Sequence, residues 1–596
     1  MPEEPRAPRL EDLALLGNCQ FSALVDRGGA VVWCCLPRFD AEPVFSTLLD
    51  DEGGGRFVVS SADGTKGIQR YLDNTNVLET RFESPGGSFR VLDFAPRFIL
   101  HDRVFRPTQL FRVVEPLRGT PRVQVRCAPR LGWSKAEPRE LRGSNHVDFE
   151  GFESPLRLTT DIPLAYLEKG RSFALTERRH LALTWGAPIE EPLESLCDRF
   201  LAETVRYWQR WVKHCNVPYL YQGEVIRSAL ALKLHCFEDT GAILASTTTS
   251  IPEAPGSGRT WDYRYCWLRD AYYALGAFRL LGHFEEREHF LEFLLNVASG
   301  SPELELSPLY RLDGGSDLDE RIMDGWPGYG GHGPVRVGNG AANHVQNDIF
   351  GEMVLALTPV FLDDRFKVDH SKEALRLIER LARKAIAVVG TPDAGIWEYR
   401  TEWKPQTFSS LMSWAGADRM ALVAARQAPA LEGEFRAAAA RIREEIVTQA
   451  WNPAVGSFVG HHGGSDLDAS LLQAATLRLL PAEDPRLRST VDVIWKTLSK
   501  DGWLFRYHRD DGFGQPKVAF IICTFWLIEA LAAIGRAEEA SAVMKHVHAA
   551  LSPLGLLSED YETADLRMWG NFPQAYSHVG LIHAAFAASP PWAGFL

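Results

Sequence analysis

The stretch LRDAYYALGAFRLLGHFEEREHFLEFLLNVAS, residues 268–299, contains two helical patterns that are separated only by Gly282-His283. Apolar side chains recur at spacings of three and four residues on both sides of this pair, which predicts helices over 268–281 and 284–299. A two-residue, glycine-led connection is too short for a crossover, so the two helices must be antiparallel neighbours. The stretch therefore predicts a helical hairpin.

The rest of the C-terminal part repeats this plan. The same spacing predicts ten further helices, at 219–237, 343–363, 371–389, 409–428, 431–450, 467–480, 484–499, 517–535, 537–550 and 574–588. Connections after the second, sixth, eighth and tenth helices are short, whereas those after the odd-numbered helices are long, for instance 300–342, 390–408 and 551–573. If successive helices alternate in direction, all long loops leave one end, which is typical of an (α/α)6 barrel with its site there. A helical solenoid is the alternative, but the sequence has no repeat of fixed period.

In the first part of the chain, apolar residues recur with a different period. Alternating, β-rich runs such as SFRVLDFAPRF (88–98) and RVQVRCAPR (122–130) are separated by turn signals up to about residue 190. This pattern favours an antiparallel β-sandwich. Helical spacing returns at 191–215 and predicts a linker helix. We therefore expect a multidomain β plus α protein, with an N-terminal β-sandwich at 1–190, a linker helix at 191–218 and an (α/α)6 catalytic barrel at 219–596.

Composition excludes several classes of function. The chain has 596 residues, of which 45% are apolar, and its formal net charge is −13. A strongly acidic protein is a poor partner for nucleic acid or for an anionic membrane. The N-terminus lacks the basic region of a signal peptide, and no window approaches the ~20 apolar residues of a membrane span. We expect a cytoplasmic protein; whether it forms a homo-oligomer is left open.

The nine cysteines are scattered, odd in number and without a CxxC pair. This argues against a disulfide framework and against a zinc site. The adjacent Cys34 and Cys35 are expected to be small apolar residues of a strand. The acidic run DGGSDLDERIMD (313–324) lacks the ligand spacing of a calcium loop, so we interpret it as solvated. No metal or cofactor is expected.

The segment RTWDYRYCWLRD, residues 259–270, is unusual in composition, with three arginines, two aspartates, two tyrosines and two tryptophans. Unpaired charges are too costly for a buried core, and four large aromatic residues do not suit a plain solvated surface. Flat rings mixed with bidentate polar groups fit a sugar, whose faces are apolar and whose rim carries hydroxyls. The alternative is a charged helix start with packed aromatic side chains.

Two other site-end loops carry carboxylates. Glu398 follows Trp397 in DAGIWEYR (393–400), and Glu559 lies in GLLSEDYE (555–562) with Asp560 and Glu562 as competitors. A facing pair of this kind is what glycoside hydrolysis needs, one as acid and one as base. An indole beside Glu398 would desolvate it and favour its protonated form. The alternative for either glutamate is an ordinary residue of a surface loop.

Four motifs together resemble the bacterial branch of glycoside hydrolase family 15, the glucoamylase, glucodextranase and trehalase-like enzymes. They are WDYRYCWLRD (261–270), GIWEYR (395–400), LLSEDYE (556–562) and GNFPQAYSHVGL (570–581). The resemblance covers nearly the whole chain, including the sandwich. It implies an inverting, exo-acting hydrolase that releases β-D-glucose from the non-reducing end of α-glucans, short α-glucosides or trehalose.

The resemblance also implies site residues. Glu398 would be the general acid and Glu559 the general base, while Arg269 and Asp270 would grip the outer hydroxyls of the bound glucose. The remaining substrate-binding residues implied are Tyr263, Trp267, Trp397, Arg506 and Tyr507.

The chain departs from the family at two places. Tyr399 stands where fungal members have a second glutamate, and Phe408-Ser409-Ser410 stands where many bacterial relatives have His-Ser-Lys. Both departures are expected on the leaving-group side, where they bear on substrate preference. An inverting α-glucoside phosphorylase and a non-catalytic glucan-binding protein are the alternative functions. The first should lack a base carboxylate in the last site loop, and the second should lack the acid or the base.

Overall fold

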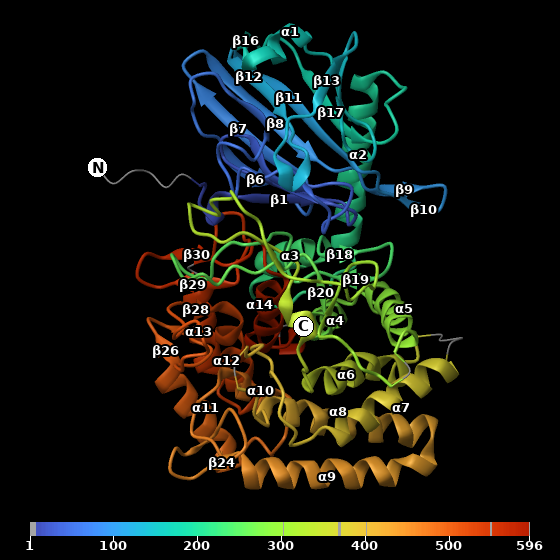
Figure 1. Cartoon of the computed structure of the whole chain (residues 1–596), viewed down its shortest axis with the longest axis vertical. Coiled ribbons are helices and arrows are strands. Elements are labelled where there is room, and N and C mark those ends of the chain that lie inside the picture. The colour runs from blue at the N-terminus through green and yellow to red at the C-terminus, as the bar shows by residue number, and fades with distance from the viewer. Residues whose placement is uncertain (1–6, 302, 367–370, 401, 549–550, 595–596) are drawn as a thin grey trace.

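The computed structural model describes residues 7–301, 303–366, 371–400, 402–548 and 551–594. Figure 1 shows an all-β part at one end of the molecule and a helical part at the other. This arrangement confirms the predicted fold class, in which a β-sandwich precedes a barrel of helices.

Two antiparallel sheets form the β part within the described residues. One contains β1 (Ala14–Gly17), β2 (Ser22–Val25), β3 (Ala30–Cys35), β4 (Pro43–Phe45), β5 (Arg56–Ser61), β12 (Arg122–Ala128) and β16 (Phe173–Ala174). The other, in order across the sheet, contains β13 (Arg139–Arg142), β14 (His146–Glu150), β15 (Leu156–Thr160), β17 (Arg179–Trp185), β11 (Gln109–Gly119), β8 (Gly87–Phe94), β7 (Leu78–Ser84) and β6 (Ile68–Tyr71). A separate hairpin, β9 (Phe98–Leu100) and β10 (Arg103–Phe105), projects from the side of the sandwich (Figure 1).

Alternation of side chains explains how the sheets pack. In β7, Leu78, Thr80 and Phe82 are buried while Arg81 and Glu83 are exposed; Glu79 is the exception, a buried carboxylate paired with Arg70 and Arg90. The Phe82 ring stacks on the Phe89 ring of the neighbouring strand, with the ring centroids 4.7 Å apart. Such period-two burial is what a sheet with one core-facing surface requires. The expected strand of small apolar cysteines is β3, in which Cys34 and Cys35 are both buried.

A long helix, α2 (Leu193–Lys213), follows the sandwich where the linker helix was predicted. Its buried side chains include Phe200, Trp208 and Trp211, at helical spacing along one face. Phe200 contacts Phe98 and Phe111 of the sandwich, with centroid distances of 5.2 and 5.5 Å. The exact limits of the three predicted domains stay a prediction.

Twelve helices of the described residues form the barrel. The inner ring is α4 (Leu268–Leu281), α6 (Asp348–Leu362), α8 (Thr407–Gln427), α10 (Gln473–Thr476), α12 (Ile521–Ala533) and α14 (Ala575–Ala588). Each of these helices contacts the next one in the ring, and α14 contacts α4; the contact between α8 and α10 is made through the 3-10 turn that precedes α10. The outer helices are α3 (Gln222–Lys233), α5 (Glu285–Ser299), α7 (Ser371–Ala387), α9 (Glu432–Gln449), α11 (Pro485–Leu498) and α13 (Ala537–His548). The predicted hairpin at 268–299 is therefore α4 and α5. The predicted last residues of α13, 549–550, lie outside the described residues.

One predicted helix is much shorter than expected. The apolar spacing over 467–480 gives only a 3-10 turn, Ala469–Leu472, and the single turn of α10. Asp468 caps this turn, accepting a hydrogen bond from the Ser470 amide at 2.9 Å. Its carboxylate also accepts from the Trp397 indole, and Arg478 has a positive φ of 63° that ends the helix. These contacts override the local helical pattern.

The sandwich supports the loops at the site end of the barrel. The Trp33 indole of β3 donates to the backbone carbonyl of Thr247 at 2.8 Å, and the buried Arg264 guanidinium donates to the carbonyl of Ala41 at 2.8 Å. Both Thr247 and Arg264 belong to the long connection between α3 and α4. The first site loop is therefore held between the two parts of the molecule.

Candidate active site

A single pocket collects side chains from the long loops of the barrel. It has about 810 Å³ of empty space, counted out to its open mouth. Eight of the nine predicted site residues line it, namely Tyr263, Trp267, Arg269, Asp270, Trp397, Glu398, Arg506 and Glu559. Further lining residues are Ala245, Glu253, Arg259, Trp261, Asn339, Ile396, Tyr399, Arg400, Asp511, Phe513, Phe520, Gln574 and Tyr576.

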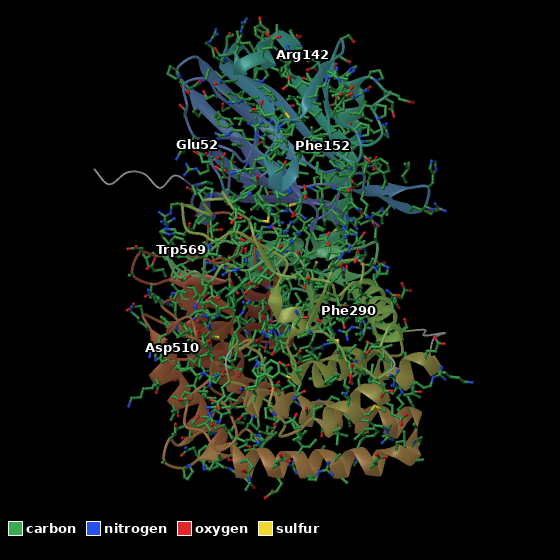
Figure 2. All side chains as sticks on the ribbon, viewed as in Figure 1. Glu52, Arg142, Phe152, Phe290, Asp510 and Trp569 are labelled. Carbon is green, nitrogen blue, oxygen red and sulfur yellow. The ribbon has the colours of Figure 1, made fainter. Side chains whose placement is uncertain are left out.

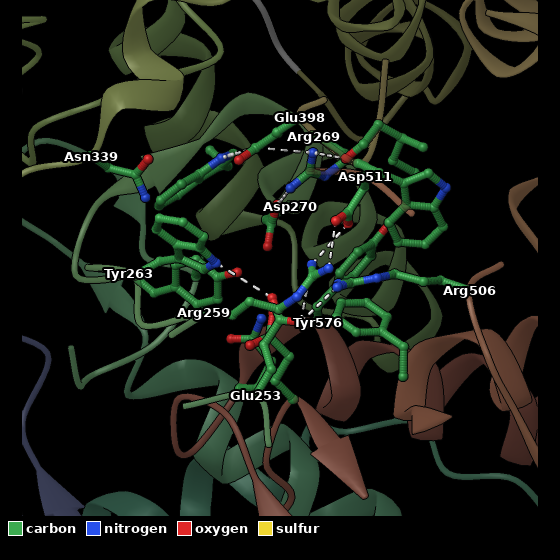
Figure 3. A pocket seen from close by; sticks show the side chains of 18 of the residues that line it. Glu253, Arg259, Tyr263, Arg269, Asp270, Asn339, Glu398, Arg506, Asp511 and Tyr576 are labelled. Atoms are coloured by element: carbon green, nitrogen blue, oxygen red, sulfur yellow. Dashed lines mark hydrogen bonds and ion pairs between the residues drawn. The ribbon is translucent and has the colours of Figure 1, made fainter. Parts of the chain in front are cut away.

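Glu398 lies on the loop between α7 and α8. Its φ of 59° is in the left-handed region, which costs a non-glycine residue and marks a tightly determined position. The Trp267 indole Nε1 donates to Glu398 Oε1 at 2.6 Å, and Arg269 Nη1 lies 3.5 Å from the same oxygen (Figure 3). The Glu398 side chain remains 21% exposed, so it is positioned and still accessible to a substrate.

Trp397 directly precedes Glu398 on this loop. Its indole does not bond to the neighbouring Glu398 but donates to both carboxylate oxygens of Asp468, at 2.9 Å each. Its ring packs edge-on against Phe520, with centroids 5.5 Å apart. The donor that holds Glu398 is instead Trp267, which is 131 residues away in sequence. The predicted desolvation of Glu398 by Trp397 stays a prediction.

Arg269 and Asp270 lie in the first turn of α4 and point into the pocket (Figure 3). Arg269 Nη2 lies 3.1 Å from Asp270 Oδ2, and Arg269 Nη1 donates to the carbonyl of Ile396 at 2.8 Å. Burial raises the pKa of Asp270, while the Arg269 charge opposes this shift. A buried, paired acid and guanidinium can grip hydroxyl groups from two sides.

Glu559 stands directly before the short strand β29 (Asp560–Glu562), which pairs with β28 (Ala519–Phe520) and β30 (Arg567–Trp569). The following motif is shaped around it, because a Cβ at Gly570 would lie only 2.6 Å from the Cβ of Glu559. Burial and the nearby Glu253 raise the pKa of Glu559 to about 8, against the lowering effects of a hydrogen bond from Tyr263 and of the Arg506 charge. Glu559 is thus a strong base once it is ionised.

The two competitors of Glu559 do not line the pocket. Asp560 is buried and takes part in strand pairing with Phe520, while Glu562 accepts a hydrogen bond from the Trp569 indole at 3.2 Å. Of the three acids in this loop, only Glu559 is available to a bound substrate.

A buried network around two arginines, Arg259 and Arg506, lines another part of the pocket (Figure 3). Arg506 Nη2 donates to Glu253 Oε2 at 2.6 Å, and Arg259 forms a two-point ion pair with Asp511. Tyr507 is the predicted residue that does not line the pocket. Its hydroxyl donates to Asp511, the carboxylate that is ion-paired with Arg259.

The departure at Phe408 also lies outside the pocket. Phe408 is buried in the first turn of α8, and the Ser409 hydroxyl donates to Asp393 Oδ2 at 2.7 Å, which anchors the start of the Glu398 loop. The expectation that this segment faces the leaving group stays a prediction. Tyr399, the other departure, does line the pocket.

The family model described as "Glycosyl hydrolases family 15" matches residues 220–586, and the model "Trehalase-like, N-terminal" matches residues 4–163. The first match spans more than half of the chain. The chain belongs to glycosyl hydrolase family 15. It is accordingly a glycoside hydrolase.

Relatives of this family 15 enzyme resemble it over almost their whole length. A protein named trehalase from Thermoplasma volcanium is 31% identical, covering 97% of this chain and 93% of its own. One from Mycobacterium tuberculosis is 33% identical, covering 97% and 89%. The structure of a bacterial glucoamylase complexed with acarbose superposes with a TM-score of 0.68 at 14% identity, over 98% of this chain and 95% of that one, which shows the shared fold.

Sequence reasoning missed several lining residues of this family 15 hydrolase. Arg259 and Trp261 were inside the quoted segment, and Asp511 lay in the unusual run LFRYHRDDGFG (504–514), so their composition was a usable signal. Glu253 lies outside any segment of unusual composition, so the sequence carried no signal for it. The acidic run 313–324 is largely exposed, as expected for a solvated segment. Glu320 is the exception, because its half-buried carboxylate accepts from Arg400 Nη2 at 2.9 Å.

The described residues contain no group of three or more histidine, cysteine or acidic side chains placed to hold a metal ion. Among the helices in the described ranges, none combines the length and apolarity that crossing a bilayer needs. All nine cysteines are free thiols. The chemistry that the pocket itself offers is acid–base chemistry on a bound sugar.

Proposed function

We propose that this family 15 hydrolase cleaves α,α-trehalose, with inversion at the attacked carbon. Glu398 gives a proton to the glycosidic oxygen, and Glu559 takes one from the water that attacks the anomeric carbon on the opposite face. After release of both glucose molecules, the proton on Glu559 leaves to solvent and Glu398 is reprotonated from solvent. No covalent enzyme intermediate is formed.

One observation carries the proposal. Glu398 and Glu559, on the loops of different hairpins, line one pocket in a chain that is similar over nearly its full length to proteins named trehalase. In this proposal, Arg269 and Asp270, which line the same pocket, hold the glucose whose bond is cleaved. For inversion, the two carboxyl groups must leave room for a water, which typically requires a separation of about 6.5–9.5 Å.

A glucose-release panel tests the substrate. Trehalose, maltose, isomaltose and a longer α-glucan are compared with and without phosphate, and trehalose is expected to give the highest kcat/KM. Glucose 1-phosphate among the products would identify a phosphorylase instead. Absence of turnover with every substrate, together with measurable binding of a glucan, would identify a binding protein.

Proton NMR tests the stereochemistry on trehalose. Inversion at one carbon releases one β-glucose and one α-glucose per molecule cleaved, because the leaving glucose keeps its own configuration. Retention would release α-glucose alone. Spectra recorded before mutarotation distinguish the two, and an initial excess of the α-anomer well above equal amounts would overturn the base role of Glu559.

A further inference from the structure

The mouth of the pocket is built differently from its floor. The floor residues Trp267, Asp270 and Glu559 are buried, whereas Phe513 is 39% exposed, Arg400 is exposed and Trp261 is half-buried. Trp261, Arg400 and Phe513 come from three different long loops of the barrel. Together they form the outer wall of the pocket, which we call the collar.

Trp261 is the centre of the collar. The guanidinium carbon of Arg400 lies 4.1 Å from its ring centroid, and the Phe513 ring meets it edge-on with centroids 5.3 Å apart. A fourth loop supplies Glu320, which binds Arg400 at 2.9 Å and Arg336 at 3.2 Å. The Arg336 guanidinium carbon lies 4.6 Å from the same indole. Three other loops thus converge on the Trp261 side chain.

Phe513 is held by buried charges and not by packing alone. The Phe513 amide donates to Asp511 Oδ1 at 3.1 Å, and Asp511 is ion-paired with Arg259. The guanidinium carbon of Arg259 also lies 5.5 Å from the Phe513 ring centroid. Because Arg259 and Asp511 are both buried, their ion pair holds the exposed Phe513 ring in position at the pocket mouth.

The collar closes the pocket mouth on one side. The guanidinium carbon of Arg400 lies 5.9 Å from the Phe513 ring centroid, so the two groups nearly touch across Trp261. Non-bonded carbon atoms pack at about 3.5–4.0 Å, and a pyranose ring cannot pass between groups this close. A leaving sugar next to Glu398 would instead meet the Arg400 guanidinium, two residues along the chain, and the exposed phenyl face.

We propose that Trp261, Arg400 and Phe513 bind the leaving sugar and restrict the substrate to one sugar unit beyond the cleaved bond, that is, to α-linked disaccharides. This inference rests on the proposed hydrolase function and names the residues that set its substrate length. The three are specificity-determining residues, and the proton transfers are made by Glu398 and Glu559.

The test uses Arg400→Ala and Phe513→Ala in the full chain. The matched control is Arg365→Ala, another exposed arginine, which stacks on Phe284 at 4.0 Å and pairs with Asp363. The collar variants are expected to lose about tenfold in kcat/KM on trehalose and to raise the maltotriose-to-trehalose ratio of kcat/KM by about tenfold. The control should change neither quantity by more than about twofold.

A second measurement separates a local effect from general damage. The inhibition constant of 1-deoxynojirimycin, an iminosugar the size of one glucose, should stay within about twofold of wild type in the collar variants, because it needs only the inner pocket. Equal losses of kcat/KM on trehalose and on maltotriose, together with an equal loss of affinity for the iminosugar, would overturn the inference. So would a wild-type enzyme that prefers maltotriose or longer glucans to every α-linked disaccharide.

Failure of the proposed trehalase function would look different. The wild-type enzyme would then leave trehalose intact and cleave another α-linked disaccharide, such as maltose or isomaltose. The same variants are in that case compared on this disaccharide and its trisaccharide, with the same expected change in their ratio.

Discussion

The rings of Tyr263 and Trp267 meet edge-on with their centroids 5.3 Å apart, and each donates its polar hydrogen to a different carboxylate. Trp267 donates to Glu398, and Tyr263 donates to Glu559. Edge-to-face rings hold a preferred geometry. The proposed acid and the proposed base are therefore positioned from one five-residue segment before α4, although the two glutamates come from distant loops.

Tyr263→Phe should move the acid limb of the pH profile to higher pH. The hydrogen bond from Tyr263 lowers the pKa of Glu559, so its removal raises that pKa above about 8 and delays ionisation of the base. The measurement is kcat/KM against pH on the best substrate. An unchanged or lowered limb would contradict the role of Glu559.

Glu253→Gln should move the same limb in the opposite direction. Glu253 raises the pKa of Glu559 by charge repulsion, so a neutral side chain lowers that pKa and lets the base ionise at lower pH. In the wild type, the limb should lie well above the usual glutamate pKa of about 4.3. Glu562→Gln, in the same loop as Glu559 but outside the pocket, is the control and should leave the limb in place.

Glu398→Gln should lower kcat by about a hundred- to ten-thousand-fold with little change in the thermal midpoint of unfolding. The amide keeps the shape of the side chain and removes the proton that the glycosidic oxygen receives. Glu402→Gln, an exposed glutamate in the same loop, is the matched control and should retain full activity. Near-wild-type turnover by Glu398→Gln on the best substrate would show that another group is the acid.

Asp270→Asn should lower kcat/KM for every substrate by a similar factor, about ten- to a hundredfold. The reason is that Asp270 would bind the glucose ring that all α-glucosides share, on the floor beside Arg269. Tyr399→Phe, at the pocket wall, should change the order of substrates instead. If Asp270→Asn changed preference and left the best kcat/KM intact, Asp270 would not hold the shared ring.

The repeated helical hairpin was predictable because its information is local. The spacing of apolar residues and the two-residue connection at Gly282-His283 predict α4 and α5, and the alternation of loop lengths predicts the barrel. Glu398 and Glu559 could be named because they stand in distinctive loop motifs. The helix predicted at 467–480 is shorter because it begins only after Asp468, which caps it and is held by Trp397, and ends before Arg478, which has a left-handed φ. Neither feature is contained in a local pattern.

The rest of the pocket depends on contacts between distant loops. Glu253 reaches Arg506 across 253 positions, and Trp267 reaches Glu398 across 131. Such pairs are decided by how the hairpins close into a ring, so composition could indicate that Arg259 and Trp261 matter but not what they contact. Tyr507 shows the same limit, since its residue type suggested a sugar contact and its position makes it a support for Asp511.

The hydrogen bond from Trp33 to the Thr247 carbonyl has a practical consequence for protein engineering. Because the first site loop is anchored in the sandwich, a shortened version that begins at α3 would lose one wall of its scaffold together with the buried contact between Arg264 and Ala41. If the sandwich were replaced by that of a relative, the residues of the loop between α3 and α4 that contact Trp33 and its strand would have to be replaced with it. In a library of chimaeric enzymes, the sandwich and the barrel should therefore be taken from the same parent.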